Sequence, residues 1–179
     1  MVVAARQLIR ERGYHATALS DVLELSEAPR GSVYFHFPGG KAELAIEAAE
    51  HHARDQVEQI DQAARESASP ADLIRAYVNQ ARENLVASGY QEGCTLAPLV
   101  IESGRDSDEL GDVGGRTFTM IIEALTAHFA AFGLASAAAR RLADAVVAGT
   151  EGALVLARAL RSPAPFESVL AVLENQVPA

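Results

Sequence analysis

Side chains that can bind a DNA duplex are concentrated in residues 30–36. The guanidinium of Arg30 can pair with a phosphate or with the edge of a guanine, and the hydroxyls of Ser32 and Tyr34 can bond phosphate oxygens. Gly31 has no side chain, so the backbone there can approach a duplex closely. We expect the DNA-facing side of this segment to comprise Arg30, Gly31, Ser32, Tyr34, Phe35 and His36.

Two short helices separated by a three-residue turn are predicted to position these side chains. In the first helix, Leu19, Val22 and Leu23 follow the i, i+3 and i+4 spacing of a single apolar face. Thr17 precedes them and is suited to cap the helix N-terminus. An apolar face of this kind must pack against another element, so this helix is expected to be part of a small core.

The second helix is predicted to begin at Pro29, because a proline at the first helical position loses no hydrogen bond. Val33 and Phe37 would then point inward, four residues apart, and leave the DNA-facing set on the opposite side. A helix-turn-helix that serves only for packing is the other interpretation of this pattern. The outward positions expected for Arg30 and Tyr34 favour DNA binding.

The block as a whole resembles the DNA-binding domain of the tetracycline-repressor (TetR) family. The residues that carry the resemblance are Gly13, Tyr14, Thr17, Arg30, Gly31, Ser32, Val33, Tyr34, Phe37 and Lys41. The resemblance implies an operator in double-stranded DNA as a partner and adds Thr17 and Lys41 to the expected DNA-binding residues. The turn departs from the family pattern, since Glu27 stands where a glycine is usual. A positive φ at Glu27 would cost about 1 to 3 kcal/mol.

Composition and charge restrict how such a domain can bind DNA. The 179 residues carry a formal charge of −9, of which residues 1–50 contribute −2 from five basic and seven acidic side chains. DNA affinity must therefore come from the local placement of basic groups and helix N-termini. The single cysteine, Cys94, excludes an internal disulfide and, with the lack of a signal or membrane segment, predicts a cytoplasmic protein.

Helical periodicity continues along the rest of the chain, so an all-α fold is predicted. Residues 1–45 are expected to form the helix-turn-helix domain, and residues 46–179 a ligand-binding and dimerisation domain. Ser69 and Pro70 are a clear helix start, and Pro98 limits its segment to a short helix. The predicted helices cover residues 2–12, 42–65, 70–88, a short piece around 98, a segment from the Asp106–Glu109 cap to 133, 136–160 and a last helix around 166–173.

Two apolar stripes run along the helix predicted for residues 136–160, and each stripe needs a partner. One partner can be the chain itself, and the simplest second partner is another copy, which predicts a homodimer. The stripes comprise Leu142, Val146, Gly149, Ala153 and Leu156, and Ala143, Val147, Thr150, Leu154 and Ala157. These last two helices resemble the dimer interface of the TetR family, and the Phe37–Lys41 run and Gly93–Cys94 resemble its LmrA/YxaF-like subgroup.

The helices between these regions are predicted to line a pocket for a largely apolar or aromatic ligand with one to three hydrogen-bonding groups. A solid core is the alternative, in which Tyr77 is a core aromatic residue and Cys94 a small buried hydrophobic residue. The candidate ligand-binding residues are Tyr77, Asn84, Cys94, Leu96, Leu99, Glu102, Phe118 and Ile122.

The resemblance implies a transcriptional regulator, with a repressor released from its operator by a small lipophilic or aromatic ligand as the leading interpretation. No Gly-rich phosphate loop, nucleophile elbow or H-x-x-x-H pair supports an enzyme, and no cofactor or metal is implied. Adjacent His51 and His52 would point about 100° apart on a helix, so they cannot chelate one metal together. A helical protein-binding adaptor without DNA binding is the alternative function.

Overall fold

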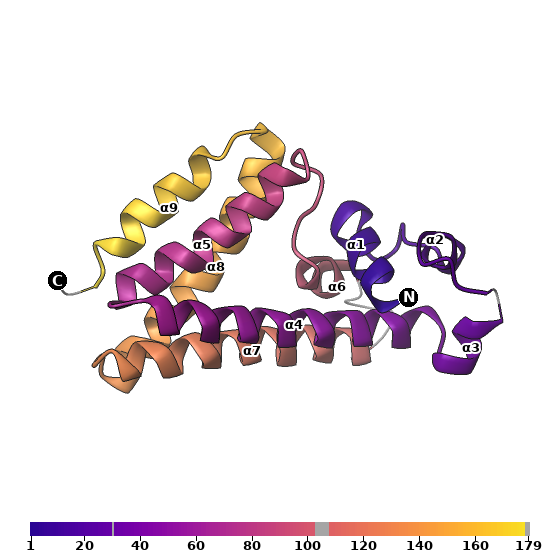
Figure 1. Cartoon of the computed structure of the whole chain (residues 1–179), viewed down its shortest axis with the longest axis horizontal. Helices are drawn as coiled ribbons and strands as arrows, with labels where there is room; N and C mark the ends of the chain where they lie inside the picture. The colour runs from indigo at the N-terminus through magenta and orange to yellow at the C-terminus, as the bar shows by residue number, and fades with distance from the viewer. Residues whose placement is uncertain (30, 103–107, 178–179) are drawn as a thin grey trace. The chain divides into compact units, whose positions relative to one another are not determined.

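The computed structural model describes residues 1–29, 31–102 and 108–177, and its regular elements are α-helices (Figure 1). None of the helices in these ranges is both long and apolar enough to cross a membrane. The helices are α1 (Val2–Arg12), α2 (Leu19–Leu25), α3 (Ser32–His36), α4 (Lys41–Glu66), α5 (Pro70–Ala87), α6 (Leu96–Glu102), α7 (Asp108–Ala131), α8 (Ser136–Leu160) and α9 (Ala164–Glu174).

The chain divides into two compact units that do not follow the order of the sequence. The first unit comprises Met1–Arg54 and Cys94–Phe118, and the second comprises Asp55–Gly93 and Thr119–Ala179. The helices α4 and α7 each contribute residues to both units. The functional boundary that we expect, with DNA binding in residues 1–45 and ligand binding in residues 46–179, is a different division from these two units. It stays a proposal.

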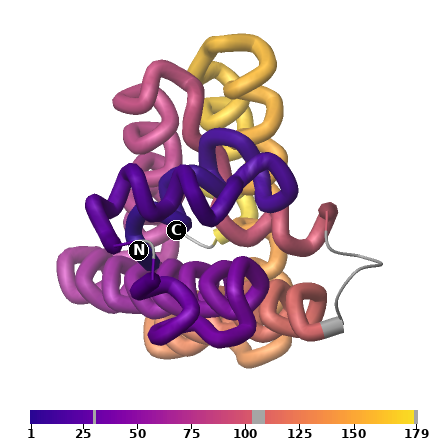
Figure 2. Tube along the Cα trace, turned by 90° about the vertical axis from the view of Figure 1, so that its right-hand side faces the viewer, coloured from indigo at the N-terminus to yellow at the C-terminus, as the bar shows by residue number. Residues whose placement is uncertain are grey.

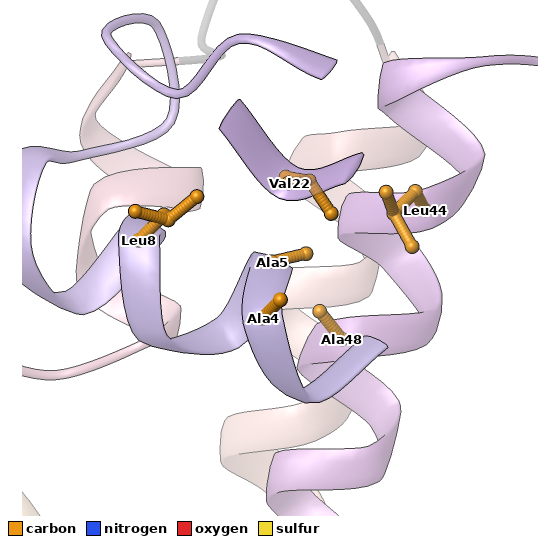
Figure 3. Close-up of a cluster of buried hydrophobic side chains, with 6 residues drawn as sticks. All are labelled: Ala4, Ala5, Leu8, Val22, Leu44 and Ala48. Atoms are coloured by element: carbon orange, nitrogen blue, oxygen red, sulfur yellow. The ribbon is translucent and has the colours of Figure 1, made fainter. Parts of the chain in front are cut away.

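The first unit has a core of small and medium apolar side chains from α1, α2 and α4. Figure 3 shows these side chains pointing toward one another, and each of them is at most 6 % exposed. Leu19 and Phe37 are partly buried against the same cluster, as their spacing predicts. The cluster comprises Ala4, Ala5, Leu8, Val22, Leu44 and Ala48. Its small residues let α1, α2 and α4 pack closely together.

In the second unit, α5, α8 and α9 lie side by side (Figures 1 and 2). As predicted, Ser69 is the N-cap of α5 and Pro70 its first residue, and the Ser69 hydroxyl accepts a hydrogen bond from the backbone N–H of Asp72. Phe166 of α9 and Val146 of α8 are fully buried. Much of the apolar surface of α8 is therefore covered within its own chain.

Two of the predicted helix starts are wrong. The N-cap of α2 is Ala18 rather than Thr17, and Thr17 instead donates its hydroxyl to the carbonyl oxygen of Gly13 at 2.7 Å. The second helix begins at Ser32 rather than Pro29, because the carbonyl oxygen of Pro29 accepts the N–H of Ser32 at 2.9 Å, three residues further on, whereas an α-helix pairs residues four apart. The predicted cap at Asp106 lies outside the described residues, and α7 is described from Asp108 onward.

Candidate functional site

The turn between α2 and α3 has the backbone geometry that the sequence predicts to be costly. Glu27 has a φ of 53°, in the left-handed region that glycine adopts most easily. The N–H of Ala28 donates to the carbonyl oxygen of Leu23 at 3.0 Å. This bond closes the C-terminal end of α2, with Glu27 as the left-handed residue of the cap. The turn therefore ends α2 at Leu25.

The helix α3 has a buried side and an exposed side. Val33 is 1 % exposed, whereas Tyr34 is 65 % and Phe35 82 % exposed. His36 is also exposed, and its ring meets the ring of Phe35 edge-on with centroids 5.1 Å apart. An exposed aromatic pair beside a buried valine is unusual for a solvent-facing helix, because apolar rings gain free energy from burial. This side of α3 is therefore available to a partner.

Other members of the expected DNA-binding set have partners within the chain or lie elsewhere. Ser32 donates its hydroxyl to the carbonyl oxygen of Pro29 at 2.7 Å, and Gly31 is exposed just before α3. Thr17 is only 3 % exposed, so its hydroxyl is directed into the protein. Arg30 lies outside the described residues. Among the members of the set that the structure describes, the aromatic side chains of α3 and Gly31 are therefore the most accessible.

Lys41 is the single lysine of the chain, and it lies at the start of α4. Its Nζ donates to the carbonyl oxygen of His15 at 3.0 Å and lies 4.5 Å from the centroid of the Tyr14 ring. Burial lowers the pKa of Lys41 from its ordinary value, and the carboxylate of Glu102 acts in the opposite direction. Lys41 therefore holds the connection between α1 and α2.

Glu102, at the end of α6, also forms hydrogen bonds with the connection between α1 and α2. Its Oε2 accepts the backbone N–H of His15 at 2.7 Å, and its carbonyl oxygen is 2.9 Å from His15 Nε2. Sequence reasoning missed His15, because its partner is 87 residues away and no periodicity links the two. The only signal was a polar residue between Tyr14 and Thr17, two members of the family pattern.

The candidate ligand-binding residues are divided between the two units. Leu96 and Leu99 are fully buried, and the Sγ of Cys94 accepts the Leu96 N–H at 3.2 Å. In the second unit, Asn84 is exposed and accepts a hydrogen bond from Gln80. The first unit holds Cys94, Leu96, Leu99, Glu102 and Phe118, and the second holds Tyr77, Asn84 and Ile122.

A cavity of about 520 Å³ lies between α4 and α5 in the second unit. Tyr77 is the member of the candidate set that lines it, together with apolar residues such as Ile60 and Leu73 and several glutamines. The thiol and the buried leucines of the first unit do not line this cavity. Its volume lies in the range of small-molecule sites.

Comparisons with known proteins show which family has this architecture. Residues 2–48 match the family described as "Bacterial regulatory proteins, tetR family", and residues 70–172 match "Transcriptional regulator LmrA/YxaF-like, C-terminal domain". The chain belongs to the TetR family of transcriptional regulators. It is therefore a transcription regulator with a helix-turn-helix DNA-binding domain, and not an enzyme.

Relatives of this TetR-family chain resemble it over nearly its whole length. An HTH-type transcriptional regulator of Mycobacterium tuberculosis (strain H37Rv) is 36% identical over 180 residues, which cover 98% of this chain and 91% of the relative. YxaF, an HTH-type transcriptional regulator of Bacillus subtilis (strain 168), is 28% identical over 97% of this chain and 89% of its own length.

Solved structures share the fold. A TetR transcriptional regulator from Legionella pneumophila has a TM-score of 0.86 at 19% identity, covering 99% of this chain and 95% of that one. A regulatory protein TetR from Rhodobacter sphaeroides has a TM-score of 0.85 at 24% identity, covering 98% and 95%. At these identities, the likeness supports the fold alone.

Proposed function

We propose that this TetR-family chain is a repressor that binds an operator in double-stranded DNA through α3 and the turn before it. The observation that carries the proposal is the exposed side of α3, where Tyr34 and Phe35 project away from the buried Val33. Ring faces and a phenol hydroxyl can contact the backbone and base edges of a major groove. Because the partner is chromosomal DNA in a bacterial family, we place this action in the cytoplasm.

The net negative charge of the N-terminal segment affects how the proposed DNA binding depends on salt. Residues 1–50 carry a net charge of −2, so few phosphate contacts are available. Affinity should then depend only shallowly on salt, because each phosphate neutralised adds about one unit to the slope of log K against log salt. Specific recognition by the α3 side chains would carry a larger share of the binding free energy.

We further propose that two copies associate through α8 and α9. Apolar side chains that the chain itself leaves more than half exposed occur at Val155, Leu156 and Leu160 on α8 and at Val172 on α9. A second copy would remove these side chains from water, at about 25 cal/mol per Å² of apolar surface buried. A dimer would also present two α3 helices to two half-sites about 34 Å apart.

The effector in this proposal is a small lipophilic or aromatic molecule that lowers operator affinity. The cavity between α4 and α5 supports a binding site at Tyr77, since its wall combines apolar surface with amide groups. A second candidate site for the effector is lined by the members of the candidate set on α6 and α7, chiefly Leu99 and Phe118. The alternative is that these side chains form a solid core. A protein-binding adaptor is not favoured by the family assignment.

The proposal is tested by selecting genomic fragments with the purified protein and measuring their retardation in gels. We expect a small set of related sequences, protected over two half-sites. Compounds that raise the melting temperature should lower operator affinity by the factor by which operator DNA lowers theirs. Retention of no specific fragment would contradict DNA binding, and stabilising compounds without effect on DNA would contradict release by an effector.

A further inference from the structure

The connection between α1 and α2 is held at one residue by two oppositely charged side chains. The backbone N–H of His15 donates to Oε2 of Glu102 at 2.7 Å, and its carbonyl oxygen accepts from Nζ of Lys41 at 3.0 Å. The carboxylate comes from the end of α6 and the ammonium from the start of α4. Both contacts are charge-assisted hydrogen bonds, which are stronger than bonds between neutral groups.

The local backbone is shaped to admit the carboxylate. Gly13 has a φ of 86°, and a Cβ built on it would collide with the carboxylate of Glu102. Glycine therefore suits the backbone conformation at this position, and its lack of a side chain leaves room for the Glu102 carboxylate. The imidazole of His15 adds a further contact, because its Nε2 lies 2.9 Å from the carbonyl oxygen of Glu102.

The position of His15 just before the helix-turn-helix gives this contact its importance. The helix α2 starts only four residues later, and its N-cap makes no side-chain hydrogen bond. The connection has bonds of its own, from Thr17 to Tyr14 and Gly13, but its outer residue His15 is held from outside. A loss of the Glu102 contact would therefore loosen the entry into the helix-turn-helix.

We propose that Glu102 is a positioning residue of the DNA-binding domain, which sets operator affinity by holding His15 without touching DNA. This inference rests on the proposed function, because it assumes that the helix-turn-helix binds an operator. It also assigns Glu102 to the support of the helix-turn-helix domain rather than to the wall of an effector pocket.

The test uses the variants Glu102→Ala and Glu102→Gln. The control is Glu109→Ala, which removes one exposed carboxylate from the same unit. The probe is the duplex that the wild-type protein selects from a random-sequence DNA library. Glu102→Ala should weaken binding about 10-fold, the consequence of losing one charge-assisted hydrogen bond. Glu102→Gln should recover part of the affinity, because its amide oxygen can still accept the His15 N–H, and Glu109→Ala should bind like the wild type.

The salt dependence separates positioning from direct electrostatics. Glu102→Ala should keep the wild-type slope of log K against log salt, since no phosphate contact is lost. Equal affinity in all variants would overturn the proposal. Tighter binding by Glu102→Ala would also overturn it, because the carboxylate would then only repel DNA.

The reactivity of Lys41 tests the placement of Glu102 without DNA. Because the Glu102 carboxylate raises the pKa of Lys41, both Glu102 variants should acetylate faster at Lys41 with an activated acetyl ester at mildly alkaline pH, as measured on the peptide by mass spectrometry. Unchanged acetylation would overturn the placement of Glu102 beside this connection. A wild-type protein that selects no duplex would overturn the proposed function, whatever the acetylation result.

Discussion

Gly149 of α8 lies against Val169 of α9 in the same chain, since a Cβ built on Gly149 would come within 3.0 Å of Val169 Cγ1. Gly152, three residues further along α8, is exposed and has open space around it. The sequence pattern places Gly149 in one of the two apolar stripes of this helix, of which one is expected to meet the chain itself and the other a second copy. In the structure, Gly149 instead contributes to packing within the second unit, and Gly152 lies on the accessible side of α8.

The two glycines should therefore respond differently to a large charged side chain. Gly149→Arg should destabilise the chain by about 1 to 3 kcal/mol, the usual cost of overpacking. Gly152→Arg should keep the helical content but dissociate the dimer, because association would bury an unpaired charge. Circular dichroism and light scattering measure the two effects. A fully stable Gly149→Arg, or a Gly152→Arg protein that keeps twice the chain mass, would contradict the assignment.

The exposed side of α3 should be essential for DNA and dispensable for folding. Tyr34→Phe removes one hydroxyl from a side chain that is 65 % exposed, so operator binding should weaken by about 1 kcal/mol without a change in thermal stability. Val33→Ala is the control, since Val33 is 1 % exposed and its truncation should lower stability by about 1 to 3 kcal/mol. Unaltered operator affinity in both Tyr34→Phe and Phe35→Ala would exclude this side as the reader.

Glu27→Gly should stabilise the protein, because the φ of 53° at this position suits glycine better than glutamate. The gain should be about 0.5 to 1 kcal/mol, since the added freedom of glycine in the unfolded chain offsets part of the relief. Glu24→Gly, inside α2, should lower stability by about 1 kcal/mol. Denaturant titration measures both changes, and destabilisation by both substitutions would show that Glu27 carries no strain.

The start of α5 should contribute a stability that is lost in acid. The Ser69 hydroxyl lowers the pKa of Asp72 below its ordinary value of 3.8, with help from the Ala68 N–H and from Arg75. A lowered carboxyl pKa means that the unfolded chain binds the proton more readily. The stabilisation is therefore complete above the unfolded pKa and disappears as the pH falls through the folded pKa.

Ser69→Ala tests this arrangement. Loss of the cap should cost about 1 kcal/mol at neutral pH. The gap in melting temperature between variant and wild type should narrow in acid, where protonation of Asp72 has already weakened the bond to Ser69. A gap that stays constant from neutral to acidic pH would show that the hydroxyl acts only on the backbone N–H.

Local pattern was sufficient for much of this fold. The end of α1 before Gly13, the cap of α5 at Ser69 and the start of α8 at Ser136 agree with the predicted bounds, because periodicity and capping depend on neighbouring residues. The resemblance to the TetR family and its LmrA/YxaF-like subgroup was confirmed by the family matches. These features depend on residues a few positions apart in the chain.

Only the tertiary structure decided which side of each helix meets which neighbour. Spacing predicts that α8 has two apolar stripes, but it cannot tell that Gly149 faces Val169 while Gly152 faces outward. In the same way, the short helix around Pro98 was predictable, but the hydrogen bond from His15 to Glu102 spans 87 residues. Contacts of this range arise only when separate helices pack, because the direction of a side chain has meaning only relative to the element that it meets.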